Sequence, residues 1–314
     1  MRVHCDIAGL PAARRAVTLG VFDGVHAGHR RILGALGAAK RREGLASALA
    51  VTFWPHPLAV LRPERAPGLL LTLEERVAAL AATGLDELVV LEFTAEVAGT
   101  DYADFARETL VGALGLRRLV VGYDFHLGRG RAGTAEALAA LGETLGYRVE
   151  VVTPCYSDGR IVSSSHIRAD LTAGRLAAVA AALGRPFPLS GRVEPGDGRG
   201  AALGFPTANL APPPPEKLLP PLGVYLVRCR WLAGQAWQPG LLNLGLAPTL
   251  RGRFVPEVHL LVGSVDLGGR ELQVEILEWL RAEQRFPDAE ALKTAIAADV
   301  ATARRRLAAG SFPL

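Results

Sequence analysis

The chain has 314 residues, of which 50% are hydrophobic and 21% are charged, with a formal net charge of +4. This composition is typical of a globular protein long enough for two domains, and it excludes disordered and fibrous classes. The basic residues are scattered along the chain, so the positive charge does not favour a nucleic-acid surface.

The number of cysteines and the distribution of apolar residues indicate the cellular compartment in which the protein is expected. The three cysteines, Cys5, Cys155 and Cys229, are odd in number and widely spaced, which predicts a reducing compartment and no disulfide framework. We find no basic and apolar leader pattern and no apolar run of about 18 residues, so neither export nor a membrane span is expected. The expected location is the cytoplasm.

Apolar runs alternate with helical patterns through the first half of the chain. The predicted strands are 17–22, 48–53, 87–93, 118–121 and 148–152, and the predicted helices are 30–40, 72–82, 101–114 and 134–145. Thr72 and Glu75 have the spacing of a capping box at the start of the second helix. Repeated alternation of this kind indicates a doubly wound parallel sheet, with ligands at the carboxyl ends of its strands.

The string VTLGVFDGVHAGHRRIL places two histidines where the first strand gives way to a helix. The apolar run breaks at Asp23 and Gly24, and His26 and His29 follow just before the predicted helix. Free backbone N–H groups and the positive end of the helix dipole suit a phosphate there, and Gly24 and Gly28 allow its close approach. An ordinary capped turn and half of a zinc site are the alternatives, although no cysteine pair offers the remaining zinc ligands.

The second half of the chain has a different pattern, which begins after residue 185. Short β-rich segments with Gly- and Pro-rich connections predict strands over 189–193, 223–231, 238–244, 257–262 and 271–280. A final helix over 288–307 has one apolar face, formed by Leu292, Ile296, Val300, Ala303 and Leu307. An Ala-rich stretch, 171–183, is a predicted linking helix. We therefore predict two domains, 1–184 and 185–314, the second a small antiparallel barrel.

Further motifs follow the histidine turn in order along the chain. They are FWPHP (53–57), LTLEER (71–76), VGYDFHLGRGRAG (121–133), VSSSHIR (162–168), LGFPTANL (203–210), GVY (223–225), NLGLAPT (243–249) and EVH (257–259). This set resembles the bacterial bifunctional riboflavin kinase/FAD synthetases, whose first half belongs to the HxGH nucleotidyltransferase superfamily. The resemblance implies a Rossmann-like nucleotidyltransferase domain followed by a riboflavin kinase barrel. It also implies that riboflavin is phosphorylated to FMN and FMN adenylylated to FAD, with Mg²⁺-ATP as co-substrate in both reactions.

The resemblance assigns one set of residues to adenylyl transfer. It implies that His26 and His29 donate to the α-phosphate, and that the flavin lies near His56 and Pro57. The residues that it places on ATP or its phosphates are Gly20, Phe22, Asp23, Gly24, Gly28, Asp124, Ser163, Ser164, Ser165 and Arg168. Ser165 stands where the family usually has Thr, and it keeps the hydroxyl. Without the resemblance, three serines before a helix are an N-cap pattern, and FWPHP is the end of a buried strand.

A second set of residues is assigned to the kinase reaction. A primary alcohol is a poor nucleophile at neutral pH, so a carboxylate base is expected, and Glu257 is the candidate. Thr207 and Asn209 would bind Mg²⁺, and Gly204 and Asn209 would lie against the phosphates. No GxxxxGK[ST] string occurs, which excludes a P-loop kinase. Taken alone, PTAN is a turn and Glu257 a surface charge.

The kinase half also departs from the family pattern. Relatives commonly have Asp-Phe after EVH and an Asp-Leu-Tyr-Gly turn, where this chain has Val262-Gly263 and the string DLGG at 266–269. Loss of the aromatic residue is expected to loosen the flavin pocket. A monofunctional FMN adenylyltransferase with an inactive barrel is therefore the first alternative. A flavin- or nucleotide-sensing regulator or an RNA binder is the second, although no basic stripe interleaved with aromatic residues supports RNA binding.

Overall fold

The computed structural model describes residues 1–310 apart from 197, 233, 247–253 and 264. It divides the chain into two compact units, Met1–Ser164 and Ser165–Leu314. The boundary predicted after residue 184 separates the two expected catalytic domains and differs in kind from this division into compact units. It stays a prediction.

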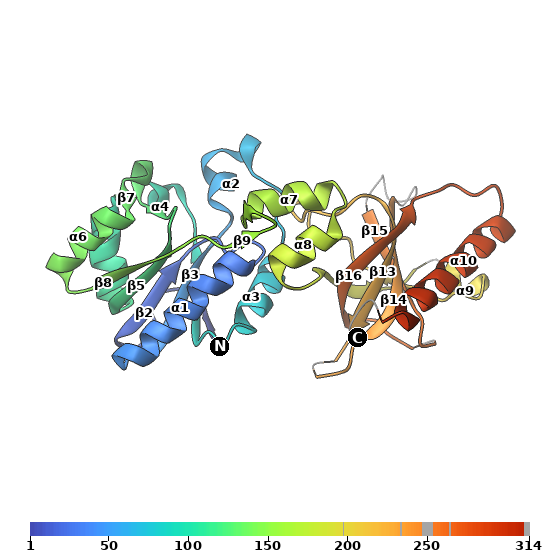
Figure 1. The fold of residues 1–314 in the computed structure, drawn as a ribbon, viewed down its shortest axis with the longest axis horizontal. Coiled ribbons are helices and arrows are strands. Elements are labelled where there is room, and N and C mark those ends of the chain that lie inside the picture. The colour runs from blue at the N-terminus through green and yellow to red at the C-terminus, as the bar shows by residue number, and fades with distance from the viewer. Residues whose placement is uncertain (197, 233, 247–253, 264, 311–314) are drawn as a thin grey trace. The chain divides into compact units, whose positions relative to one another are not determined.

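The first unit is built on a six-stranded parallel sheet with the strand order β1-β4-β3-β2-β5-β8 (Figure 1). Its strands are β1 (Arg2–His4), β2 (Arg15–Leu19), β3 (Ser47–Trp54), β4 (Glu87–Glu92), β5 (Leu116–Gly122) and β8 (Arg148–Val152). Neighbouring strands pair in parallel throughout. The predicted doubly wound α/β architecture is confirmed.

Helices and short ribbons connect these strands. The helices are α1 (Ala27–Glu43), α2 (Pro57–Leu61), α3 (Leu73–Ala81), α4 (Ala95–Gly99), α5 (Tyr102–Asp104), η2 (Phe105–Ala113) and α6 (Ala135–Leu145). Two elements, η1 (Pro63–Arg65) and η3 (Arg129–Arg131), are single 3-10 turns. The two-residue strands are β6 (His126–Leu127), β7 (Gly133–Thr134), β9 (Tyr156–Ser157) and β10 (Arg160–Ile161). The helix predicted over 101–114 is mainly π-helical, because η2 forms most of it.

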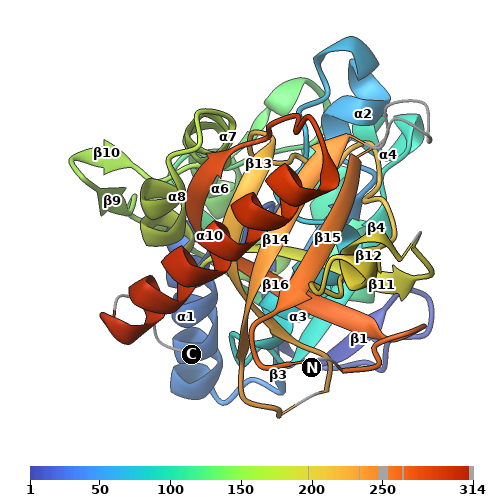
Figure 2. The same cartoon turned by 90° about the vertical axis from the view of Figure 1, so that its right-hand side faces the viewer.

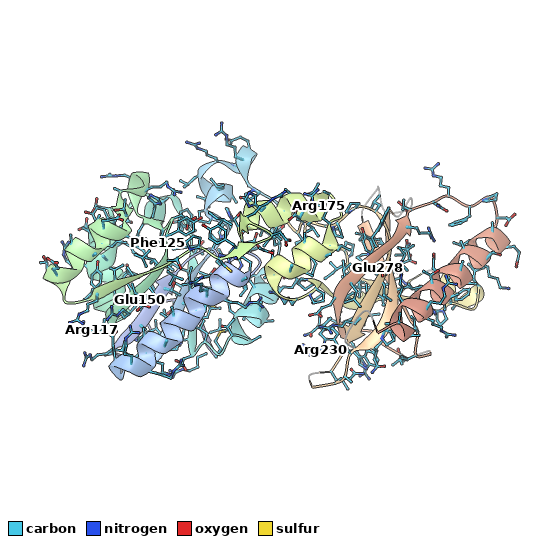
Figure 3. The ribbon with its side chains drawn as sticks, viewed as in Figure 1. Arg117, Phe125, Glu150, Arg175, Arg230 and Glu278 are labelled. Atoms are coloured by element: carbon cyan, nitrogen blue, oxygen red, sulfur yellow. The ribbon has the colours of Figure 1, made fainter. Side chains whose placement is uncertain are left out.

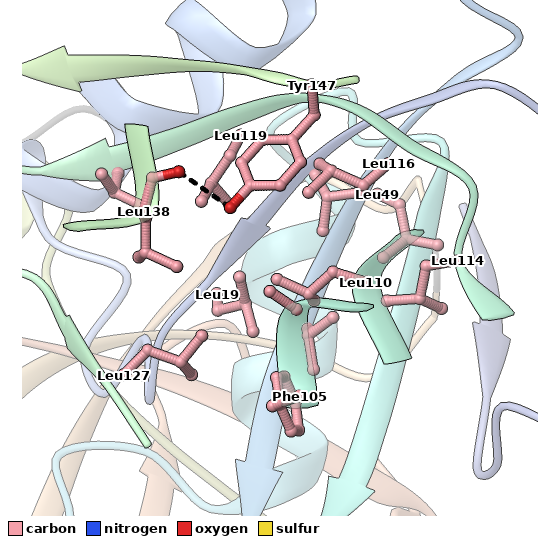
Figure 4. Packing of buried hydrophobic residues seen from close by; sticks show 14 of the residues in the cluster. Leu19, Leu49, Phe105, Leu110, Leu114, Leu116, Leu119, Leu127, Leu138 and Tyr147 are labelled. Atoms are coloured by element: carbon pink, nitrogen blue, oxygen red, sulfur yellow. Dashed lines mark hydrogen bonds between the residues drawn. The ribbon is translucent and has the colours of Figure 1, made fainter. Parts of the chain in front are cut away.

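Both faces of the sheet are buried, because successive residues of each strand point to opposite sides. Val17 and Leu19 pack with η2 and α6 in one core cluster, whereas Ala16 packs with α1 and α3 in the other. Figure 4 shows the first cluster, in which the Tyr147 hydroxyl donates to the Leu138 carbonyl at 2.8 Å. The near-continuous apolar strands of the sequence are explained by this double burial.

Strand order fixes where a ligand can bind. From β2 the chain winds through β3 and β4 to one side, and β5 and β8 lie on the other side. The carboxyl ends of β2 and β5 therefore form the switch point of the sheet, where a crevice opens in such folds. The turn with the two histidines follows β2, and the GYDF segment follows β5.

The opposite edge of the sheet is held by buried ionic groups. Arg15 on β2 and Glu87 on β4 are each 1% exposed, and Arg15 Nε donates to Glu87 Oε1 at 3.3 Å. The same guanidinium also donates to the carbonyls of Leu114 (3.1 Å) and Pro11 (2.8 Å). Arg15 and Glu87 begin their strands, so this cluster lies at the amino ends of the strands, away from the switch point.

The second unit begins with two helices in place of the single linking helix predicted over 171–183. They are α7 (Ser164–Thr172) and α8 (Leu176–Leu183). The single-helix prediction is wrong because the chain reverses at Gly174, whose φ of 71° lies in the left-handed region that ends a helix.

A closed antiparallel barrel with the strand order β11-β12-β15-β14-β13-β16 forms the rest of this unit, as predicted (Figure 2). The elements are β11 (Phe187–Glu194), α9 (Arg199–Ala202), β12 (Ala208–Leu210), β13 (Gly223–Arg230), β14 (Gln238–Leu246), β15 (Phe254–Leu260), β16 (Glu271–Ala282) and α10 (Ala289–Ala308).

The terminal helix α10 packs on the outside of the barrel. Val224 and Leu226 of β13 form a buried hydrophobic cluster with Ala303 of α10. Val300 and Leu307 of the same helix pack against this cluster. These three helix residues belong to the predicted apolar face. A salt bridge of 3.3 Å joins Arg306 of α10 to Glu278 of β16, which is labelled in Figure 3.

The first prediction concerns α8, which contacts β11 and β16 and buries Leu176, Val179 and Leu183. A fragment 165–314 should unfold cooperatively in urea. A fragment 184–314, which lacks these side chains, should have a free energy of unfolding lower by about 3 kcal/mol or more, because each buried aliphatic side chain contributes about 1.5–3 kcal/mol. Equal stabilities of the two fragments would contradict a structural role for α8.

Candidate active sites

The turn between β2 and α1 has an unusual backbone. Phe22, Gly24 and Val25 all have positive φ angles, of 51°, 88° and 42°. Only the glycine adopts this region freely, and strained non-glycine residues concentrate at functional sites. The side chains of Phe22 and Val25 are buried in the core beneath the turn. The strand ends at Leu19 rather than at Phe22 as predicted, because the backbone leaves the sheet to form this turn.

The two imidazoles lie together over the first turn of α1. His26 is the N-cap, and its Nδ1 accepts a hydrogen bond of 3.3 Å from the backbone N–H of His29. The rings stack with centroids 3.6 Å apart and planes 17° apart. A Cβ on Gly28 would lie only 3.1 Å from His26 Cε1, so any larger residue there would press on the His26 ring. The prediction that the helix starts at Arg30 is wrong, because capping by His26 starts it at Ala27.

The His29 ring is held in an environment that disfavours its charged form. Burial, followed by the nearby His26 and Arg76, lowers the pKa of His29 well below its ordinary value. Its Nδ1 is buried without a hydrogen-bond partner among the described residues. A buried lone pair is tolerated better than a buried N–H, so we infer that the proton lies on Nε2, which can then donate to a ligand.

Asp23 uses its carboxylate inside the protein. The side chain is 1% exposed, and its two oxygens accept hydrogen bonds from the backbone N–H groups of Leu70 (3.0 Å) and Leu71 (3.1 Å). The Ser164 hydroxyl donates to the Asp23 carbonyl at 2.8 Å. Asp23 and Ser164 therefore shape the turn between β2 and α1, and these contacts point to positioning rather than to direct phosphate binding.

The other residues predicted for adenylyl transfer lie around the carboxyl edge of the sheet or on α7. Ser163 precedes α7, whereas Ser165 and Arg168 lie on that helix, Ser165 being exposed. Asp124 follows β5 and is exposed, with its carbonyl 2.8 Å from His126 Nδ1.

The remaining predicted positions flank the ends of β2 and β3. Gly20 follows β2, and a Cβ there would lie 3.2 Å from the Phe22 ring. His56 caps α2, whose first residue is Pro57, and its Nδ1 accepts from the Leu58 N–H at 3.1 Å.

One charged residue of this region was not singled out from the sequence. Arg76 on α3 is fully buried, four residues before the buried Leu80 and four after the N-cap Thr72. The sequence signal that could have identified Arg76 as buried is its position on the apolar face of an amphipathic helix.

In the second unit the predicted kinase residues lie on neighbouring barrel strands. Asn209 of β12 is directly opposite Glu257 of β15, which in turn is opposite Asn243 of β14. Residues opposite each other in antiparallel strands project from the same face, so the three side chains form one row. Thr207 immediately precedes β12, and Gly204, with φ 88°, lies in the turn before it.

A pocket of about 180 Å³, partly open to solvent, is lined on β12 and β15 by Ala208 and Val258, which alternate with Asn209 and Glu257 and face the other side of the strands. Its lining includes Thr207, Val258, Leu260, Gly263 and Gly268. Gly263 and Gly268 belong to the two segments where the chain departs from the family pattern, so the departures fall on the pocket wall.

The two units define a nucleotide-dependent transferase with a candidate site in each. Residues 11–166 match the FAD synthetase family and residues 183–307 match the riboflavin kinase family. A relative from Pseudomonas fluorescens, a bifunctional riboflavin kinase/FMN adenylyltransferase, is 40% identical and is covered over 91% of both chains. The chain belongs to the family of bifunctional riboflavin kinase/FMN adenylyltransferases.

Two further similarities extend over nearly the whole chain. The protein of the same name from Escherichia coli K12 is 37% identical over 95% of both chains. A crystal structure described as a macrolide-efflux protein from Streptococcus pneumoniae superposes with a TM-score of 0.84 at 26% identity, covering 96% of this chain and 98% of that one. Among the described residues, no helix has the length and apolar character needed to cross a membrane.

The second prediction follows from the depressed pKa of His29. Below the unfolded-state pKa of about 6.5, the unfolded chain takes up a proton at His29 that the folded chain does not bind. The free energy of unfolding should therefore fall as the pH drops through 6.5. In urea titrations between pH 7.5 and 5.5, His29→Gln should lose less stability than the unchanged chain. Equal losses would show that His29 titrates normally in the folded protein.

Proposed function

We propose that the chain catalyses two consecutive ATP-dependent reactions, riboflavin to FMN and FMN to FAD. The observation that carries this assignment is that both family modules are present, each with its predicted reactive side chains gathered at one place. Riboflavin, FMN and ATP are the small-molecule substrates. Because both reactions consume ATP, we place them in the cytoplasm.

Adenylyl transfer is assigned to the first unit. A phosphate oxygen of FMN attacks the α-phosphorus of ATP and the bond to pyrophosphate breaks, so no covalent enzyme intermediate is needed. His29 Nε2–H donates to the α-phosphate oxygens as their charge increases, with His26 and the free N–H groups of α1 beside it. Gly24 and Gly28 leave space for the phosphates, while Asp23 and Ser164 hold the turn. Ser163 is a further predicted phosphate ligand in this unit, and His56 and Pro57 are predicted flavin contacts. Ser165 and Arg168, also predicted phosphate ligands, belong to the second unit.

Riboflavin phosphorylation is assigned to the second unit. Glu257 accepts the proton of the riboflavin 5′-hydroxyl, whose oxygen attacks the γ-phosphorus of ATP as ADP leaves. Asn209 and Asn243 flank Glu257 on the same face of the barrel, where amides orient a carboxylate and its substrate. Gly204 gives the backbone the left-handed turn that leads into PTAN.

The side chains beside Glu257 fit a magnesium ion. Thr207 and Asn209 offer the hydroxyl and amide oxygens that this ion prefers. A Cβ on Gly196 would collide with the Asn209 amide, and one on Gly200 would lie 3.1 Å from Thr207 Oγ1, so the glycines keep this space small but open. When bound, Mg²⁺ neutralises charge on the ATP phosphates.

A monofunctional FMN adenylyltransferase remains the second candidate, and one observation favours it. Gly263 and Gly268 line the barrel pocket at positions where relatives commonly have larger residues. A wider pocket would bind riboflavin more weakly than in typical relatives. The decisive experiment is to incubate the chain with riboflavin and Mg²⁺-ATP and to separate the flavins. FMN and FAD together support the bifunctional assignment, FAD from supplied FMN alone supports the second candidate, and unchanged flavin contradicts both.

The third prediction tests the imidazole pair. His29→Ala should lower the rate of FAD formation from supplied FMN by about two to three powers of ten, the usual effect of losing one transition-state donor. FMN formation from riboflavin by the same preparation is the internal control and should be nearly unchanged. The assignment of His29 fails if a folded variant makes FAD at the original rate, or if both activities fall equally.

The fourth prediction tests the carboxylate. Glu257→Gln keeps the size of the side chain but removes the proton acceptor, so FMN formation should fall by roughly two to four powers of ten. The exposed Glu271 on β16 provides a matched control, Glu271→Gln, which should be fully active. Fragment 165–314 contains these residues and should phosphorylate riboflavin by itself. Near-normal turnover by Glu257→Gln at saturating riboflavin would exclude Glu257 as the base.

A further inference from the structure

A buried guanidinium lies close to the histidine turn. Arg76 of α3 is 0% exposed, in a helix whose other buried residues include Leu80. Removing such a charge from water costs several kcal/mol, and an apolar side chain of similar volume is often equally stable at a buried position. Core packing alone therefore gives no reason for an arginine at this position.

The contacts of Arg76 lead from α3 to the carboxyl end of β3 and on to the β2–α1 turn. Its Nη1 donates to Thr52 Oγ1 at 3.3 Å and to the Phe53 carbonyl at 3.2 Å. The Thr52 hydroxyl in turn donates to the Val21 carbonyl at 3.0 Å, at the start of the turn. The guanidinium also lies over the Trp54 ring, 5.5 Å from its centroid.

A second connection joins the segment before α3 to the β2–α1 turn, and here the turn supplies the hydrogen-bond acceptor. The N–H groups of Leu70 and Leu71 donate to the Asp23 carboxylate in the turn. Thr72 and Glu75 then close a capping box that starts α3. The amino end of α3 and the turn are thus joined at two separate points, through Asp23 and through Arg76 with Thr52.

We propose that Arg76 is a positioning residue for adenylyl transfer, whose buried guanidinium fixes the end of β3 and, through Thr52, the turn that presents His26 and His29. The proposal rests on the proposed function of that turn.

The charge of Arg76 has a further effect on His29. The groups that act on the His29 ring are His26 from the same turn and Arg76 from α3, while the Asp23 carboxylate is directed at backbone amides. Arginine stays charged at every accessible pH. Burial and His26 lower the pKa of His29 most, and Arg76 lowers it further while placing a permanent positive charge near the imidazole pair.

Three variants separate the two effects of Arg76. Arg76→Met removes the charge and the hydrogen bonds, Arg76→Lys keeps the charge, and Thr52→Val keeps Arg76 but removes the link to Val21. For each we would measure kcat for FAD formation from FMN, FMN formation from riboflavin as the internal control, and the pKa of His29 by imidazole NMR, with the signal assigned by its loss in His29→Gln.

We expect Arg76→Met to lower kcat for FAD formation about 10- to 100-fold, as a small misplacement of reacting groups does, and to raise the pKa of His29. Arg76→Lys should recover part of kcat and keep the original pKa. Thr52→Val should lower kcat several-fold and leave the pKa unchanged. FMN formation should not change in any of them.

Original kcat and original His29 pKa in a folded Arg76→Met chain would overturn the proposal. If Arg76→Met does not fold, full FAD formation by both Arg76→Lys and Thr52→Val would overturn it. Absence of FAD with the unchanged chain would instead overturn the proposed function of the turn, and the role of Arg76 with it.

Discussion

Three hydrogen bonds hold the β2–α1 turn in a backbone conformation that two of its own residues disfavour. Phe22 and Val25 lie in the left-handed region, at a cost of about 1–3 kcal/mol each. The Asp23 carboxylate accepts from two amides before α3, and the Asp23 carbonyl accepts from Ser164. These bonds fix the backbone just before His26, whose side chain caps the helix that starts at Ala27 and whose ring stacks on that of His29.

Features that depend on local sequence could be predicted. The alternation of apolar strands and amphipathic helices gave the doubly wound sheet, and strand order then placed the histidine turn and the GYDF segment at its switch point. Thr72 and Glu75 form the expected capping box, because both partners lie within one helical turn. The barrel followed from short strands with Gly- and Pro-rich connections, and its closure agrees with that prediction.

Features that depend on distant partners could not be predicted. The resemblance placed Asp23 at the phosphates, and its hydrogen bonds to amides 47 and 48 residues further along the chain are visible only in the fold. Arg76 ends the LTLEER motif but was given no role, because only the fold brings it to Thr52. The π-helical turn of η2 and the break at Gly174 were missed because helical periodicity alone does not distinguish these forms.

The buried Arg15–Glu87 pair lies at the amino ends of the strands, and the candidate adenylyl-transfer residues that follow β2 and β5 lie at the carboxyl ends. One edge of the sheet thus carries costly charges that bond to each other, to neighbouring side chains and to a few carbonyls, while the other edge carries the candidate ligand contacts. A lineage could replace loops after β2 or β5 and change its substrate without disturbing that anchor. Evolutionary freedom and structural constraint are thereby distributed to opposite ends of the same strands.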